Sequence, residues 1–127
     1  MPDKNSILQY QKQAITTMSR GELLVQLFEA ALKNIRYASI LFKKEDYQTA
    51  EIYIDKSTNI FNYLCTILDR KYDISIELYQ IYRFINQEII RANVKRDASI
   101  LDSIVPLVQT LHETWVEANK LSHIQNT

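Results

Sequence analysis

The chain is poor in the residues that shape turns and strands. It holds one glycine, two prolines and one cysteine in 127 residues. β-Hairpins and tight turns usually need more glycine and proline, so this scarcity argues against a sheet and favours long helices joined by short polar links. The single Cys65 has no partner for an internal disulfide, which fits a reducing cytosol.

An excess of charge of one sign and long apolar runs are also missing. Fifteen basic and fifteen acidic residues cancel, so no general attraction to nucleic acid or to an anionic membrane follows. The longest apolar runs span only a few residues, and the N-terminal MPDKNSILQY lacks the apolar segment of a signal peptide. We therefore expect a cytoplasmic protein that does not insert into a membrane.

What the chain does contain is helical periodicity. Apolar residues recur three and four positions apart in four segments, at about 19–44, 46–70, 74–95 and 98–121. The expected N-caps are Ser19 with Glu22 as its capping-box partner, Asp46, Asp73 or Ser75, and Asp97. In the third segment the inward face centres near Ile81 and Ile85, with Tyr82 at its edge.

The links between these segments are short, which makes consecutive helices antiparallel. We expect an all-α, up-down four-helix bundle over residues 19–122, with a mobile N-terminal arm over 1–18 and a frayed tail over 123–127. Pro106 lies inside the fourth segment and predicts a kink there. A helical hairpin that dimerises is the main alternative fold.

Residues for catalysis are scarce. His112 and His123 lie eleven positions apart and no Glu-x-x-His pair exists, so a metal site of the di-iron bundle type is not predicted. Gly21 is the only glycine, which excludes a glycine-rich phosphate loop. Cys65 borders the apolar stripe of its helix and is interpreted as a packing thiol. We expect neither an enzyme nor a bound cofactor.

Apolar residues outside the inward faces are more informative, because they follow helical spacing themselves. They lie on the second and third segments, which should be adjacent, and they predict one surface groove that suits an amphipathic partner helix. The expected groove residues are Ile52, Lys56, Asn59, Tyr63, Ile76, Tyr79, Arg83, Asn86, Ile90 and Val94. A helical adaptor or a homodimer that uses the same face is an equally weighted alternative.

The order and spacing of several short motifs resemble the FliS family of flagellar secretion chaperones. The motifs are TMSRGEL at 17–23, LFEA at 27–30, IYRFI at 81–85, IRAN at 90–93, KRD at 95–97 and Trp115. The family pattern usually has proline where this chain has Arg20, glycine at Ala30 and a second tyrosine at Phe84. All three departures are compatible with helices.

The resemblance implies a function as well as a four-helix bundle. Members of that family bind the disordered C-terminal segment of flagellin in the cytosol, prevent its premature polymerisation, and deliver it to FlhA, the export-gate protein of the flagellar type III system. The segment Ile7-Leu8-Gln9-Tyr10 resembles the family element that docks on the cytoplasmic domain of FlhA. Ile7 and Tyr10 are therefore the expected gate-docking residues.

Overall fold

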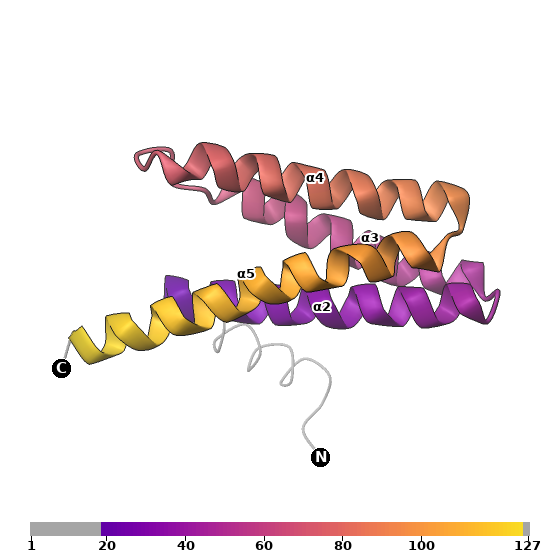
Figure 1. Cartoon of the computed structure of the whole chain (residues 1–127), viewed down its shortest axis with the longest axis horizontal. Helices are drawn as coiled ribbons and strands as arrows, with labels where there is room; N and C mark the ends of the chain where they lie inside the picture. The colour runs from indigo at the N-terminus through magenta and orange to yellow at the C-terminus, as the bar shows by residue number, and fades with distance from the viewer. Residues whose placement is uncertain (1–18, 126–127) are drawn as a thin grey trace, which may run out of the picture.

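The chain folds into an antiparallel four-helix bundle, which confirms the predicted fold class (Figure 1). The computed structural model describes residues 19–125, with side chains to residue 121. The helices are α2 (Arg20–Lys43), α3 (Tyr47–Thr66), α4 (Ile74–Lys95) and α5 (Ala98–Gln125). The predicted arm over 1–18 lies outside the described residues.

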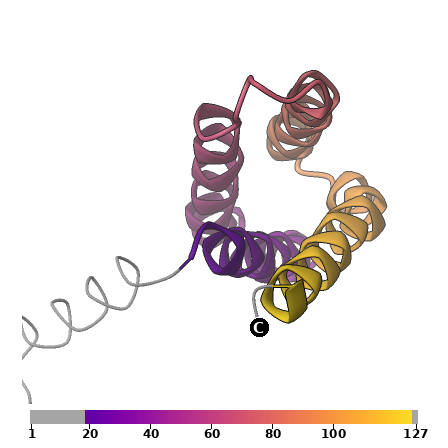
Figure 2. The same cartoon turned by 90° about the vertical axis from the view of Figure 1, so that its left-hand side faces the viewer.

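The helices form a ring in which each contacts its two sequence neighbours and α5 closes back onto α2 (Figure 2). Contacts between α4 and α5 are the sparsest of the four pairs. The ribbons of α4 and α5 diverge from their link toward the opposite end of the bundle (Figure 1). We call that opposite end, where α2 begins and α3 ends, the open end. The end with the 44–46 and 96–97 links is the closed end.

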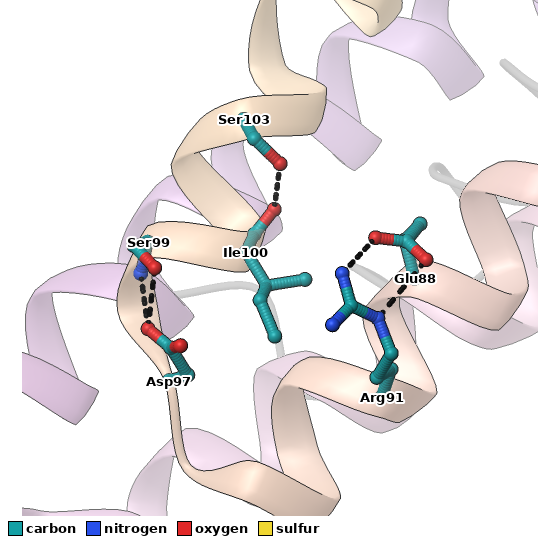
Figure 3. A network of polar contacts seen from close by, with 6 residues as sticks. All are labelled: Glu88, Arg91, Asp97, Ser99, Ile100 and Ser103. Atoms are coloured by element: carbon teal, nitrogen blue, oxygen red, sulfur yellow. Dashed lines mark hydrogen bonds and ion pairs between the residues drawn. The ribbon is translucent and has the colours of Figure 1, made fainter.

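Local signals explain where most helices begin. The Ser19 side chain accepts a hydrogen bond from the backbone N–H of Glu22 at 3.2 Å, and Asp46 accepts one from Thr49 at 3.3 Å. Asp97 accepts from both the backbone N–H and the hydroxyl of Ser99, at 2.9 and 2.6 Å (Figure 3). These bonds satisfy N–H groups that the first helical turn leaves unpaired.

Asp73 precedes α4 without a side-chain capping bond. On the last turns of α4, Arg91 donates two hydrogen bonds to Glu88 (Figure 3).

Two helix ends differ from the sequence prediction. Helix α3 was expected to continue to Arg70 but ends at Thr66, which leaves a link over residues 67–73. The Asp69 carboxylate accepts the backbone N–H of Lys71 at 3.0 Å, a local bond that competes with helix continuation. Helix α5 passes Pro106 as one element and continues to Gln125, beyond the expected fraying point. None of the helices in the described part is long and apolar enough to cross a membrane.

The core is organised around three aromatic rings from three helices. Phe28 of α2, Phe61 of α3 and Tyr82 of α4 are buried, with ring centroids 5.9 to 6.5 Å apart. Tyr82, expected at the edge of its helix face, is 1% exposed. The Trp115 side chain of α5 is a polar neighbour of its hydroxyl and lines the same cavity. Burial raises the pKa of Tyr82 to about 12, so the phenol stays protonated.

Burial of Tyr82 sets the rotation of α4. Its inward face centres on Tyr82, Ile85 and Ile89, whereas the sequence placed the centre near Ile81 and Ile85. At 100° per residue this is a rotation of about 60°. Ile81 is only partly buried as a result.

The closed end is held by polar contacts between helices. The Asp102 carboxylate on α5 accepts from the Ser39 hydroxyl at 2.6 Å and pairs with the Lys43 ammonium at 2.9 Å, both on α2. The Arg96 guanidinium lies 4.6 Å from the ring centroid of Tyr47, which ties the α4–α5 link to α3. The hydrogen bond from Ser39 and the nearby Lys43 lower the pKa of Asp102 below its ordinary value of 3.8.

Replacement of Asp102 by asparagine should reduce stability in a pH-dependent way. Because the folded-state pKa is depressed, the charged carboxylate stabilises the fold above pH 4 to 5, and this contribution is lost as the pH falls through the folded pKa. Asp102 is half exposed, so we expect a loss of only about 0.5 to 1 kcal/mol at pH 7. Urea unfolding at pH 7 and near pH 2 to 3 measures it.

The difference between Asp102→Asn and wild type should shrink at low pH. Asp55→Asn on α3 is the matched control, since Asp55 forms no ion pair in the described part of the chain. A deficit that persists unchanged at low pH would show that the charge of Asp102 does not contribute.

Candidate protein-binding surface

Nine of the ten predicted groove residues are exposed on α3 and α4. Of the apolar ones, Tyr63, Tyr79 and Ile90 expose 45%, 40% and 51% of their surface. The other six are Ile52, Lys56, Asn59, Ile76, Arg83 and Val94. Apolar side chains that are exposed together on adjacent helices are typical of a surface that binds a partner.

Asn86 is the exception, and its predicted outward position is wrong. It is 5% exposed, and its amide N–H donates to the Asn62 side-chain oxygen of α3 at 2.8 Å. The rotation of α4 that buries Tyr82 also turns Asn86 into the α3–α4 interface. The Asn86 carbonyl oxygen has no hydrogen-bond partner there.

The Asn62–Asn86 bond marks the line along which α3 and α4 meet. Tyr79, Arg83 and Ile90 are near Asn86 on the helical wheel and therefore flank this line on α4. Arg83 also acts on Cys65 of α3: burial raises the pKa of the thiol and the guanidinium opposes that rise. We call the surface along this line the α3–α4 seam.

The two ends of the seam differ in chemistry. Toward the closed end lies a polar cavity of about 310 Å³, lined by Tyr47, Gln48, Glu51, Asn93 and Arg96. Toward the open end Tyr79 and Ile76 border an apolar cavity of about 320 Å³, completed by Leu68, Arg70 and Ser75. The Arg70 guanidinium lies 5.8 Å from the centroid of the Tyr79 ring.

A second apolar cavity of about 300 Å³ lies at the open end and shares Leu68 and Ser75 with the first. We call it the end cavity, and all four helices and the 67–73 link contribute to it. Its lining comprises Arg20, Leu24, Leu64, Ile67, Leu68, Asp69, Tyr72, Ile74, Ser75, Leu78, Tyr82 and Trp115. Apolar walls with a few polar groups suit the burial of partner side chains.

Sequence reasoning missed the end cavity. The apolar spacing predicts that 67–70 continue the helix, whereas Ile67 and Leu68 form part of the cavity wall. Arg20 donates a hydrogen bond to the Ile67 carbonyl and so fixes the start of α2 against the end of α3. A usable signal was the Asp69-to-Asp73 stretch, because aspartates that bond their own backbone often end helices.

The Lys56 side chain leans over Tyr53, toward the α2 side of α3. Its ammonium lies 5.3 Å from the centroid of the Tyr53 ring, and Tyr53 packs against Tyr37 of α2. The structure therefore does not place Lys56 with the α4 residues of the predicted groove. Ile7 and Tyr10 lie outside the described residues.

The surface offers binding chemistry more than proton-transfer chemistry. Among the residues described, no three His, Cys, Asp or Glu side chains gather as they would around a metal ion. The ring nitrogen Nε2 of His112 is buried without a partner between α2 and α5, away from the seam.

Comparison with known proteins identifies the family of this chain. A family model described as "Flagellar protein FliS" matches residues 3–122. The chain belongs to the FliS family. The resemblance inferred from its motifs is thereby confirmed, and membership supports the role of a flagellar export chaperone.

Relatives in several bacteria carry the name flagellar secretion chaperone FliS. The Bacillus subtilis protein is 26% identical over 118 residues, which cover 93% of this chain and 89% of the relative. The Escherichia coli protein is 24% identical over 108 residues, or 83% and 79% of the two chains. The Salmonella typhimurium protein is 22% identical over 117 residues, or 90% and 87%.

Substitution of Asn86 tests whether its side chain is buried between α3 and α4. Asn86→Leu removes a buried, unpaired carbonyl, while the exposed Asn62 turns to water, so we expect the free energy of unfolding to rise by about 1 kcal/mol. Asn86→Asp places a charge there and should lower it by about 2 kcal/mol or more. Urea denaturation at pH 7 measures both.

Asn59→Leu is the control for the Asn86 variants, because Asn59 is exposed on α3. It should change stability by less than about 0.5 kcal/mol. If Asn86→Asp were as mild as this control, the burial of Asn86 would be wrong.

Proposed function

We propose that the protein is a cytoplasmic chaperone that binds the disordered C-terminal segment of flagellin and delivers it to the flagellar export gate. While bound, this segment is not available for premature polymerisation. Family membership supports the role, and the single observation that carries the binding site is the exposed apolar seam of α3 and α4 with the end cavity beside it.

The shape of this surface fits a client that orders as it binds. An amphipathic segment can lay apolar side chains along Tyr63, Tyr79 and Ile90 while Asn59 and Arg83 meet its polar edge. A disordered client loses conformational entropy on binding, so its affinity per unit of buried area is low. Contact with the seam and the end cavity together compensates by extending the interface.

No turnover is required by this function. The client is bound and handed over, and the residues of the seam supply contact area and hydrogen bonds instead of a nucleophile or a general base. The end cavity adds depth, because partner side chains that enter it become fully desolvated, and desolvated anchors contribute most of the binding energy in protein interfaces.

A double substitution in the seam tests the client site. Tyr79→Ala/Ile90→Ala should weaken binding of the host's own flagellin C-terminal peptide at least about tenfold, because two large apolar contacts are lost. Calorimetry gives the affinity, and circular dichroism checks that the helices remain.

Phe84→Ala is the matched control for the client site. Phe84 is also on α4 and half exposed, but it lies on the other side of the helix from Tyr79 and Ile90. We expect its affinity for the peptide to stay within about twofold of wild type. Equal affinity of the folded Tyr79/Ile90 variant and wild type would contradict a client site at the seam.

We further propose that Ile7 and Tyr10 dock on the cytoplasmic domain of FlhA. Tyr10→Ala should weaken binding of the chaperone–flagellin complex to this domain about tenfold, with flagellin affinity unchanged. Biolayer interferometry with immobilised FlhA domain measures the first, and the calorimetry above measures the second. A Tyr10→Ala complex that binds the domain as wild type does would refute this role.

A further inference from the structure

A second exposed surface lies between α2 and α3, away from the α3–α4 seam. Tyr37 of α2 and Tyr53 of α3 form a T-shaped pair with ring centroids 5.3 Å apart. Tyr37 is 42% exposed, and Ile40, nearly one turn further along α2, is 47% exposed. Aromatic rings in this position present a large rigid contact area at low cost in side-chain entropy.

A lysine lies over each ring. The Lys33 ammonium is 5.8 Å from the Tyr37 centroid, and that of Lys56 is 5.3 Å from the Tyr53 centroid. Lys33 comes before Tyr37 on α2, and Lys56 comes after Tyr53 on α3. Because the two helices run in opposite directions, both lysines lie nearer the open end than the two rings. Each of the two helices therefore contributes one cation beside the tyrosine pair.

The floor between these lysines is apolar. Ala30 on α2 and Ile60 on α3 are partly buried there, two turns from Tyr37 and Tyr53 on the same helix faces. Nearby carboxylates do not neutralise the cations. Glu29 and Glu113 line a cavity between α2 and α5 that Lys33 also borders, yet neither Lys33 nor Lys56 forms an ion pair within the described part of the chain.

We propose that this exposed surface, formed by Lys33, Tyr37, Ile40, Tyr53, Lys56 and Ile60, binds an acidic amphipathic helix of a partner protein. Apolar side chains of the partner helix contact the tyrosine pair and Ile60, and carboxylates on its two flanks pair with Lys33 and Lys56. The tyrosine pair lies on the flank of α3 that faces α2, whereas Asn62 marks the flank that faces α4 at the seam.

Charge complementarity selects this occupant. Polyanions such as nucleic acid or an anionic membrane require many cations, and this chain has fifteen basic residues balanced by fifteen acidic ones. Two separated cations beside an aromatic pair instead match two carboxylates that flank an apolar stripe. Each carboxylate gains a charge-assisted hydrogen bond from one lysine, and no ion pair within the described part of the chain has to be displaced.

Three peptides of one design test the proposal. Each is a short helical peptide with leucines on one face, flanked on both sides by glutamate, glutamine or lysine. Wild-type protein should bind the glutamate peptide at least about fivefold more tightly than the glutamine peptide. NMR shift changes should map to Tyr37, Tyr53 and Ile60. Lys33→Glu/Lys56→Glu should reverse the preference and bind the lysine peptide best.

Lys71→Glu/Lys95→Glu is the matched control, because it makes the same charge change at exposed positions outside the proposed surface. It should retain the glutamate preference. Equal binding of glutamate and glutamine peptides, or shift changes on the seam instead, would overturn the proposal. The proposal would also be overturned if phosphatidylglycerol vesicles or oligodeoxythymidine bound the protein in a way that depends on Lys33 and Lys56. Sedimentation that shows self-association of the wild type, abolished by Lys33→Glu/Lys56→Glu, would overturn it too. A negative result with these peptides would not change the expected affinity for the flagellin peptide, which calorimetry measures with the seam variants. The two proposals are therefore tested separately.

Discussion

The packing of Tyr82 against Phe28 and Phe61 is the constraint on which the arrangement of the helices depends. Trp115 of α5 lies beside the hydroxyl of this buried tyrosine. It therefore contributes to the packing between α4 and α5, the pair with the sparsest contacts. Because Tyr82 must face the centre, α4 is rotated, Asn86 is drawn into the interface with α3, and Tyr79 and Ile90 are left at the surface.

The two ends of the bundle are stabilised by different means. At the closed end, short links and polar contacts through Asp102 and Arg96 fix the helices against one another. At the open end, the seven-residue link over 67–73 and the divergence of α4 from α5 leave an apolar cavity with Trp115 as one wall. The polar contacts of the closed end are thus separated from the end cavity, which can accept apolar side chains. A partner can fill that surface without breaking the polar contacts of the closed end.

Helix α3 contributes to both exposed surfaces. One flank carries Asn62 and meets α4 at the seam, while the other carries Tyr53 and meets α2. Lys56 belongs to the second flank because its ammonium is attracted to the face of the Tyr53 ring. A small bundle therefore presents two chemically distinct exposed surfaces, one mainly apolar with amides and one aromatic with a lysine over each ring.

The sequence by itself determined the properties that are local. The number of helices, three of the N-caps and the antiparallel order follow from spacing, capping side chains and short links, and each acts within a few residues. Only the tertiary structure decided the rotation of α4, the burial of Asn86, the direction of Lys56 and the end cavity. Each depends on which neighbouring helix fills the adjacent space. A helical wheel defines a face only to within one residue step, about 100°, and the ring of Tyr82, packed beside Trp115, selects among the faces that remain.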